Sequence, residues 1–238
     1  MVESRSDERG AGIEAFELEA RALRLAVLGM LGHARRVLEE AMVLVLERRE
    51  ADVDEWEEFE GLALQQRLDI QEQASGLIAE WAGEQRAQLA AEGAVSLARI
   101  QQVAVAQSVE LRVQGGVLLQ ARETSLTQLV EPLYDVCYEN LRSLGTAFAD
   151  GDPASARAVV EREGDIRHLS LLASEQLRRR LNSDGKNGLV AWALFLCVKS
   201  LKQIGLTTME AGREFMVSGM PGAVEDLLPT SVSDGPVV

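Results

Sequence analysis

The chain of 238 residues is long enough for one large or two small domains, and its formal net charge is −14, from 38 acidic and 24 basic residues. This charge argues against nucleic acid and anionic lipid as partners, because both are bound through clustered Lys and Arg. Aromatic residues make up only 4%, and the chain is rich in the helix formers Ala, Leu, Glu and Arg, so we predict an all-α protein.

Neither a secretory signal nor a membrane span is evident in the sequence. Residues 1–12 are polar and charged, without the apolar segment of a signal, and we expect them to be disordered. The longest nearly continuous apolar run, 189–198, is too short to cross a bilayer. Cys137 and Cys197 have apolar neighbours, which is typical of buried free thiols in a reducing compartment. We therefore expect a cytoplasmic protein.

Apolar residues recur with helical spacing through the first half of the chain and predict three helices there. The first covers about 14–49, and the acidic stretch at 50–61 is expected to hold the turn after it. A second helix continues to about residue 84, and a third occupies roughly 89–123.

The second half predicts three more helices. Pro132 fits the first turn of a fourth helix or a kink in a longer one. The next boundary is well marked, because Gly151 can end a helix, Asp152 can cap the next and Pro153 suits its first turn. The fifth helix is expected to be continuous over 153–181.

A polar loop at 182–188 leads to the sixth helix, at about 189–218, and residues 220–238 form a loose tail. The sixth helix carries a seam of apolar and small residues spaced alternately by four and three, namely Leu194, Val198, Leu201, Gly205, Thr208, Gly212 and Phe215. Small residues on such a seam allow another helix to approach closely.

Two short patterns recur and indicate an internal repeat. The pair Asp69 and Ile70 returns as Asp165 and Ile166, at an offset of 96 residues. A leucine, a base and a glycine return at an offset of 90 residues, as Leu111, Arg112 and Gly115 and then as Leu201, Lys202 and Gly205. The recurrence predicts two tandem three-helix bundles, at 13–124 and 125–219.

Several segments resemble the PhoU-like regulators of phosphate uptake. They are "LGMLGHARRVLEEAMVLVL" at 28–46, "AFADGDPASARAVVEREGDIRHL" at 147–169 and "LKQIGL" at 201–206, which stands where the family has "LERIGD". The resemblance covers about 14–219. It implies two three-helix bundles and a non-enzymatic adaptor that contacts a phosphate transporter or sensor kinase at the inner membrane surface, with a homodimer left open.

The chain departs from this family at the acidic metal-binding positions of the signature. The family's Glu is replaced by Arg112 and Lys202, and its Asp by Gly116 and Leu206. Hard cations need carboxylate oxygens, which none of these side chains has. We therefore predict a member without the family's metal clusters and without a cofactor. Arg112 and Lys202 could instead attract an anion or acidic loop jointly, if the two bundles face each other.

Two other interpretations remain open. Asp165 and His168 are spaced as half of a di-metal site, which Asp69 and Glu72 would complete. A solvated helix face is the favoured explanation, because such a site needs a carboxylate–histidine pair from each of two helices and His33 is the only other histidine. The second alternative is a scaffold whose partner is unrelated to phosphate. No nucleophile–base motif or phosphate-binding loop is recognisable, so we predict no enzymatic activity.

Overall fold

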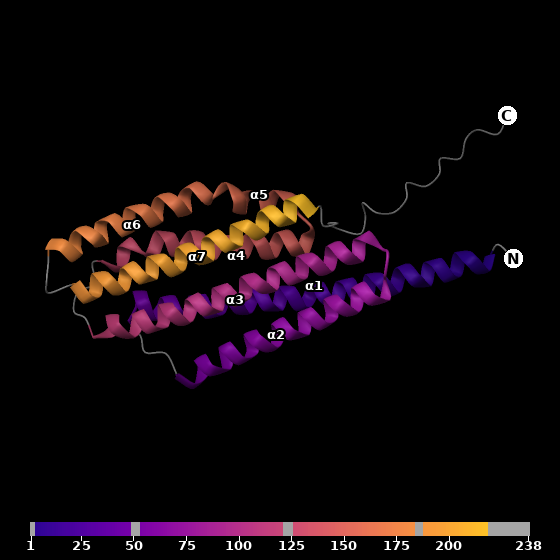
Figure 1. The fold of residues 1–238 in the computed structure, drawn as a ribbon, viewed down its shortest axis with the longest axis horizontal. Coiled ribbons are helices and arrows are strands. Elements are labelled where there is room, and N and C mark those ends of the chain that lie inside the picture. Colours follow the sequence, from indigo (N-terminus) through magenta and orange to yellow (C-terminus); the bar gives the residue numbers. More distant parts are fainter. Residues whose placement is uncertain (1–2, 49–52, 121–125, 184–187, 219–238) are drawn as a thin grey trace, which may run out of the picture.

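Every regular element of the described residues is helical (Figure 1). The computed structural model describes residues 3–48, 53–120, 126–183 and 188–218. The first triplet is α1 (Glu3–Leu46), α2 (Val53–Glu80) and α3 (Gln85–Leu119). A short 3₁₀ helix, η1 (Thr127–Leu129), precedes the second triplet. This triplet consists of α4 (Glu131–Asp150), the pair α5 (Pro153–Glu161) and α6 (Glu163–Ser183), counted together as its middle helix, and α7 (Gly188–Ser218). The predicted all-α fold is confirmed.

Four long helices form the centre of the molecule. α1 packs on α3, α3 on α7, α7 on α4 and α4 on α1, so that they form a closed ring. α2 covers α1 and α3 from outside, whereas α5 and α6 cover α7 and α4 from the other side. Figure 1 shows α2 and α6 at opposite edges of the bundle. The two triplets therefore meet along α3 and α7 and along α1 and α4.

The core runs through both triplets without a break. One connected cluster of buried apolar side chains includes residues of all seven α-helices. The predicted seam of α7 is buried over its whole length, from Leu194 to Phe215. By length and composition α7 could cross a membrane, but 56% of its most apolar window is buried inside the bundle. Its place at the centre explains its apolar sequence.

Three expected boundaries differ from the structure. α1 begins at Glu3, so residues 3–12 continue the helix where we expected disorder. α2 begins at Val53, within the stretch assigned to the turn, because Trp56 and Phe59 are 2% and 6% exposed and belong to the core. α3 begins at Gln85 and ends at Leu119, four residues before the expected bounds at each end. The predicted tail lies outside the described residues.

The boundary between α4 and α5 is as predicted. Gly151 ends α4 with a φ of 64°, and the Asp152 carboxylate accepts hydrogen bonds from the backbone N–H groups of Ala154 (2.9 Å) and Ser155 (3.0 Å). Pro153 occupies the first turn of α5. These hydrogen bonds satisfy N–H groups that a helix start leaves without partners.

The expected fifth helix is broken. α5 ends at Glu161, Arg162 leaves the helical pattern, and α6 begins at Glu163. Gly164, which weakens a helix, lies directly after the break. The Arg162 side chain turns towards α4, where its partners lie. The prediction of one continuous helix was therefore wrong, because the interactions that bend it come from another element.

Candidate functional site

Arg112 on α3 and Lys202 on α7 are the two bases that the sequence analysis places at the positions of the family's glutamates. Arg112 and Lys202 are half-buried, and each follows a leucine, Leu111 or Leu201, that is fully buried. The guanidinium carbon of Arg112 lies 5.2 Å from the centroid of the Trp56 ring, in a cation–π arrangement. In the first triplet the replacement base therefore links α3 to α2.

Gly116 and Leu206, which the sequence analysis places at the positions of the family's aspartates, have no oxygen ligand in the side chain. A Cβ atom at Gly116 would have no neighbour within 4 Å. Leu206 is half-buried and packs against the core. None of the four positions therefore offers a carboxylate: Arg112 and Lys202 are cationic, Leu206 is apolar and Gly116 has no side chain. Such residues do not suit a hard cation, which needs oxygen ligands.

The repeated glycines next to these positions have a packing role. A Cβ atom at Gly115 would lie 2.7 Å from Cγ of Leu44 on α1. One at Gly205 would lie 2.9 Å from Cδ1 of Ile166 on α6 and 3.1 Å from Sγ of Cys137 on α4. Gly115 thus makes room for a side chain of α1, whereas Gly205 makes room for side chains of α6 and α4. Both repeated glycines therefore lie at close contacts between helices.

The alternative metal ligands do not come together. Asp69 and Glu72 lie on α2, whereas Asp165 and His168 lie on α6, at the opposite edge of the bundle (Figure 1). The Asp69 carboxylate accepts a hydrogen bond from Gln65 at 2.6 Å. Among the described residues, no three His, Cys, Asp or Glu side chains form a group that could hold a metal ion. This separation removes the basis for a di-metal site built from both helices.

The buried titratable groups are poor nucleophiles or bases. His33 is 8% exposed, and its Nε2 lies 3.0 Å from the carbonyl oxygen of Phe59. Burial, together with the nearby Arg36, lowers the pKa of His33, although the hydrogen bond to Phe59 opposes this shift. Burial raises the pKa values of the Cys137 and Cys197 thiols to about 12, so both stay protonated at neutral pH.

A polar groove of about 760 Å³ runs between α3 and α7, where the two triplets meet. Exposed Arg99 and Lys199 supply two cations, and Glu110 supplies one carboxylate. The remaining lining residues are Gln102, Val103, Ala106, Gln107, Leu196, Ser200 and Gln203. Sequence reasoning missed this groove because its two walls come from different repeats. Neither Arg112 nor Lys202 lines it, so the suggested joint anion site of these two bases does not coincide with it.

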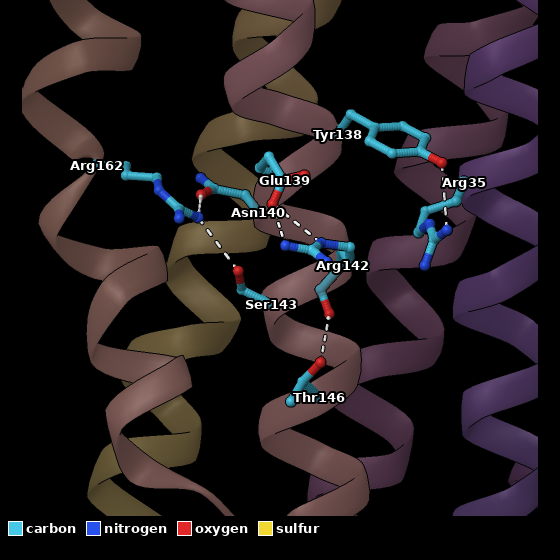
Figure 2. Close-up of polar contacts among 8 residues, drawn as sticks. All are labelled: Arg35, Tyr138, Glu139, Asn140, Arg142, Ser143, Thr146 and Arg162. Carbon is cyan, nitrogen blue, oxygen red and sulfur yellow. Dashed lines mark hydrogen bonds and ion pairs between the residues drawn. The ribbon is translucent and has the colours of Figure 1, made fainter.

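Polar side chains tie α4 to its neighbours on both sides (Figure 2). Arg162, at the break between α5 and α6, donates to Asn140 Oδ1 at 3.1 Å and to Ser143 Oγ at 3.2 Å. Arg35 of α1 donates to the Tyr138 hydroxyl at 3.2 Å, and its guanidinium lies 5.1 Å from the centre of that ring. Since these contacts join α4 to two different helices, they position α4 within the bundle.

No family model and no curated protein matches this sequence. A solved structure does match: PhoU from Pseudomonas aeruginosa, with a TM-score of 0.80 over 85% of this chain and 98% of its own. The two sequences are 14% identical, so the likeness concerns the fold. The chain has a PhoU-like, all-α helical-bundle fold.

Proposed function

We propose that the protein is a cytoplasmic, non-enzymatic adaptor that regulates phosphate transport or phosphate signalling through contacts with another protein. The observation that carries this proposal is the match of its fold to 98% of the PhoU chain. The segments at 28–46, 147–169 and 201–206, which resemble the PhoU-like family, also support it. The partner is then a phosphate transporter or sensor kinase at the inner membrane surface.

The adaptor works without the family's metal clusters. Arg112 stacks on Trp56, and Leu206 packs against the core, so both side chains serve the bundle itself. Elemental analysis of untagged protein should therefore find far less than one bound metal ion per chain. Stoichiometric zinc, iron or manganese would contradict this part of the proposal.

We assign partner binding to the groove between α3 and α7. The groove spans both triplets, and Arg99 and Lys199 remain exposed along it in a protein of strongly negative charge. These two cations suit an acidic segment of a partner, because charges of opposite sign steer association and fix its register.

Deletion of the gene tests the regulatory role. We expect the deletion to change the rate of phosphate uptake in phosphate-rich medium and the transcription of phosphate-starvation genes. The wild-type gene should restore both, whereas Arg99→Glu with Lys199→Glu should not. Arg178→Glu, which changes an exposed base on α6, serves as the matched control and should restore both. Unchanged uptake and transcription in the deletion strain would contradict the proposal.

Co-purification from native cells identifies the partner. The full-length tagged chain should retain a phosphate-transporter subunit or a sensor kinase, and the groove variant should lose it. Recovery of a single stoichiometric partner with no link to phosphate would favour the scaffold alternative instead.

A further inference from the structure

The groove between α3 and α7 continues along both helices towards the start of α7. The two helices run in opposite directions, since Ser96, early in α3, donates a hydrogen bond to Glu214, near the end of α7 (Figure 1). Residues spaced alternately by four and three form one stripe on each helix, namely Arg99, Val103, Ala106, Glu110 and Val113 on α3, and Trp192, Leu196, Lys199 and Gln203 on α7. Val113 and Trp192 are 55% and 50% exposed. The groove together with these two residues is here called the extended groove.

The two ends of the extended groove correspond to each other in the sequence repeat. The 90-residue offset between the recurring patterns relates Gln102 of α3 to Trp192 of α7. The same offset relates Val113 to Gln203. Because α3 and α7 are antiparallel, the two glutamines lie towards one end, and Trp192 and Val113 lie towards the other. An exact repeat would make the ends alike, but this groove is polar at one end and apolar at the other.

The polar end holds two bases on one side. Arg99 is exposed there, and it forms no ion pair with another residue that the structure describes. Arg67 of α2 donates a hydrogen bond to Gln102 Oε1 at 2.8 Å, which brings a second guanidinium to the same side. The exposed Glu210 and Glu214 belong to α7, on the opposite side. A carboxylate of a partner therefore fits at this end only against α3.

The apolar end presents a fixed aromatic ring. Trp192 stacks on Phe195, with ring centroids 5.7 Å apart and an angle of 17° between the planes. Leu196, one turn further along α7, is half-buried and lines the groove. An exposed indole that is held by a neighbouring ring loses little conformational freedom when a partner covers it, and Trp is enriched among the residues that dominate binding energy.

We propose that the extended groove binds an amphipathic α-helix of the partner protein, with apolar side chains at the Trp192 end and a carboxylate at the Arg99 end. This inference rests on the proposed function, which assigns partner binding to the groove. From Arg99 to Val113 the groove follows α3 for about 21 Å, the length of about four helical turns. Between the ends, Lys199 and Glu110 offset each other in charge, so the two ends determine the orientation of the bound helix.

Fluorescence anisotropy with two labelled helical peptides of about four turns tests this chemistry. The block peptide has leucines at one end of one face and glutamates at the other end, and the control peptide has the same residues alternating along that face. Full-length protein should bind the block peptide at least about tenfold more tightly. Trp192→Ser should lose this preference, whereas Leu171→Ser, at a site on α6 that is 66% exposed, should keep it. Equal affinity of the wild type for both peptides, or no binding of either, would overturn the proposal.

Disulfide trapping tests the orientation. The native Cys137 and Cys197 are buried, so an introduced surface cysteine reacts selectively. In a redox buffer, Val113→Cys should trap a block peptide that carries a cysteine at its leucine end. Gln203→Cys should trap one that carries the cysteine at its glutamate end. The opposite pairing would overturn the assigned orientation.

The outcomes separate this inference from the proposed function. If gene deletion changes phosphate uptake but both peptides bind equally, the regulatory role stands and the inferred partner chemistry is wrong. If the block peptide binds as expected but deletion changes neither uptake nor transcription, the groove binds such a helix and the link to phosphate is wrong.

Discussion

At the scale of single residues, two adjacent glycines of α3 show how surroundings decide the effect of one chemical change. Gly115 faces α1, where a Cβ atom would lie 2.7 Å from Cγ of Leu44, whereas one at Gly116 would lie in open space. Both occupy the interior of the same helix and have the same intrinsic helix propensity. Only tertiary packing distinguishes them.

We expect Gly115→Ala to lower the free energy of unfolding by about 1–3 kcal/mol, because Leu44 would have to move within a packed core. Gly116→Ala should raise it by about 0.4–1 kcal/mol, because alanine restricts the unfolded chain and favours the helix. Urea denaturation of the two variants measures both changes. Equal changes of the same sign in the free energy of unfolding would show that Leu44 moves aside without a free-energy penalty.

The buried His33 predicts a component of the pH dependence of stability. Its pKa lies below the ordinary value in the folded protein, so the unfolded chain binds a proton at a pH where the folded protein does not. The contribution of the neutral, buried imidazole should be complete above about pH 6.5 and should decline as the pH falls towards the lower folded pKa. His33→Gln, whose amide can still donate to the Phe59 carbonyl, should lack this decline.

Urea denaturation at several pH values between 5 and 8 measures the effect of pH on stability. His168→Gln is the matched control, because it replaces an exposed histidine in place of the buried one. If the stability of His33→Gln depends on pH as that of the wild type does, this component of the pH dependence does not come from His33.

At the scale of elements, the break between α5 and α6 is held by a contact with α4. Asn140 is fully buried, and its Oδ1 accepts a hydrogen bond from Arg162, while its Nδ2 has no hydrogen-bond partner among the residues that the structure describes. Arg162 also reaches Ser143, so one guanidinium bridges the two elements (Figure 2). The corresponding helix of the first triplet, α2, is continuous from Val53 to Glu80.

Arg162→Ala should destabilise the protein by about 1–3 kcal/mol, because the buried Asn140 carbonyl would lose its hydrogen-bond donor. Arg157→Ala, at an exposed position of α5, should change stability by less than about 0.5 kcal/mol. Adding Asn140→Leu to Arg162→Ala should recover part of the loss, because the polar group left without a partner is then removed. Chemical denaturation checks all three variants, and no difference between Arg162→Ala and Arg157→Ala would contradict this interpretation.

At the scale of the whole molecule, the two triplets share one connected core along α3 with α7 and α1 with α4. The division into bundles at 13–124 and 125–219 follows the recurring sequence patterns and stays a prediction. A shared core couples the two halves, since unfolding one would expose the apolar face of the other.

Scanning calorimetry should therefore show one thermal transition, with calorimetric and van't Hoff enthalpies that agree. Gly205→Val offers a probe confined to the second triplet, because its added side chain would meet Ile166 and Cys137. It should lower the temperature of the single transition without splitting it. Two separated transitions in either protein would show that the triplets unfold independently.

The features that the sequence predicted well are those that depend on near neighbours. The apolar seam of α7 follows from spacing along one helix, and the start of α5 follows from Gly151, Asp152 and Pro153. The break at Arg162 could not be predicted, because its partners Asn140 and Ser143 lie about twenty residues earlier in the sequence. The groove between α3 and α7 was missed for the same reason.

The amino-acid sequence by itself determined the helical class, the apolar seam of α7 and the start of α5, because periodicity and capping are local properties. Only the tertiary structure decided that Arg112 stacks on Trp56 and that Asp69 and Asp165 lie far apart. Each of these depends on which helices become neighbours. Which helices become neighbours depends on how apolar faces that are distant in the sequence pack together. The spacing of residues along one helix does not specify this packing.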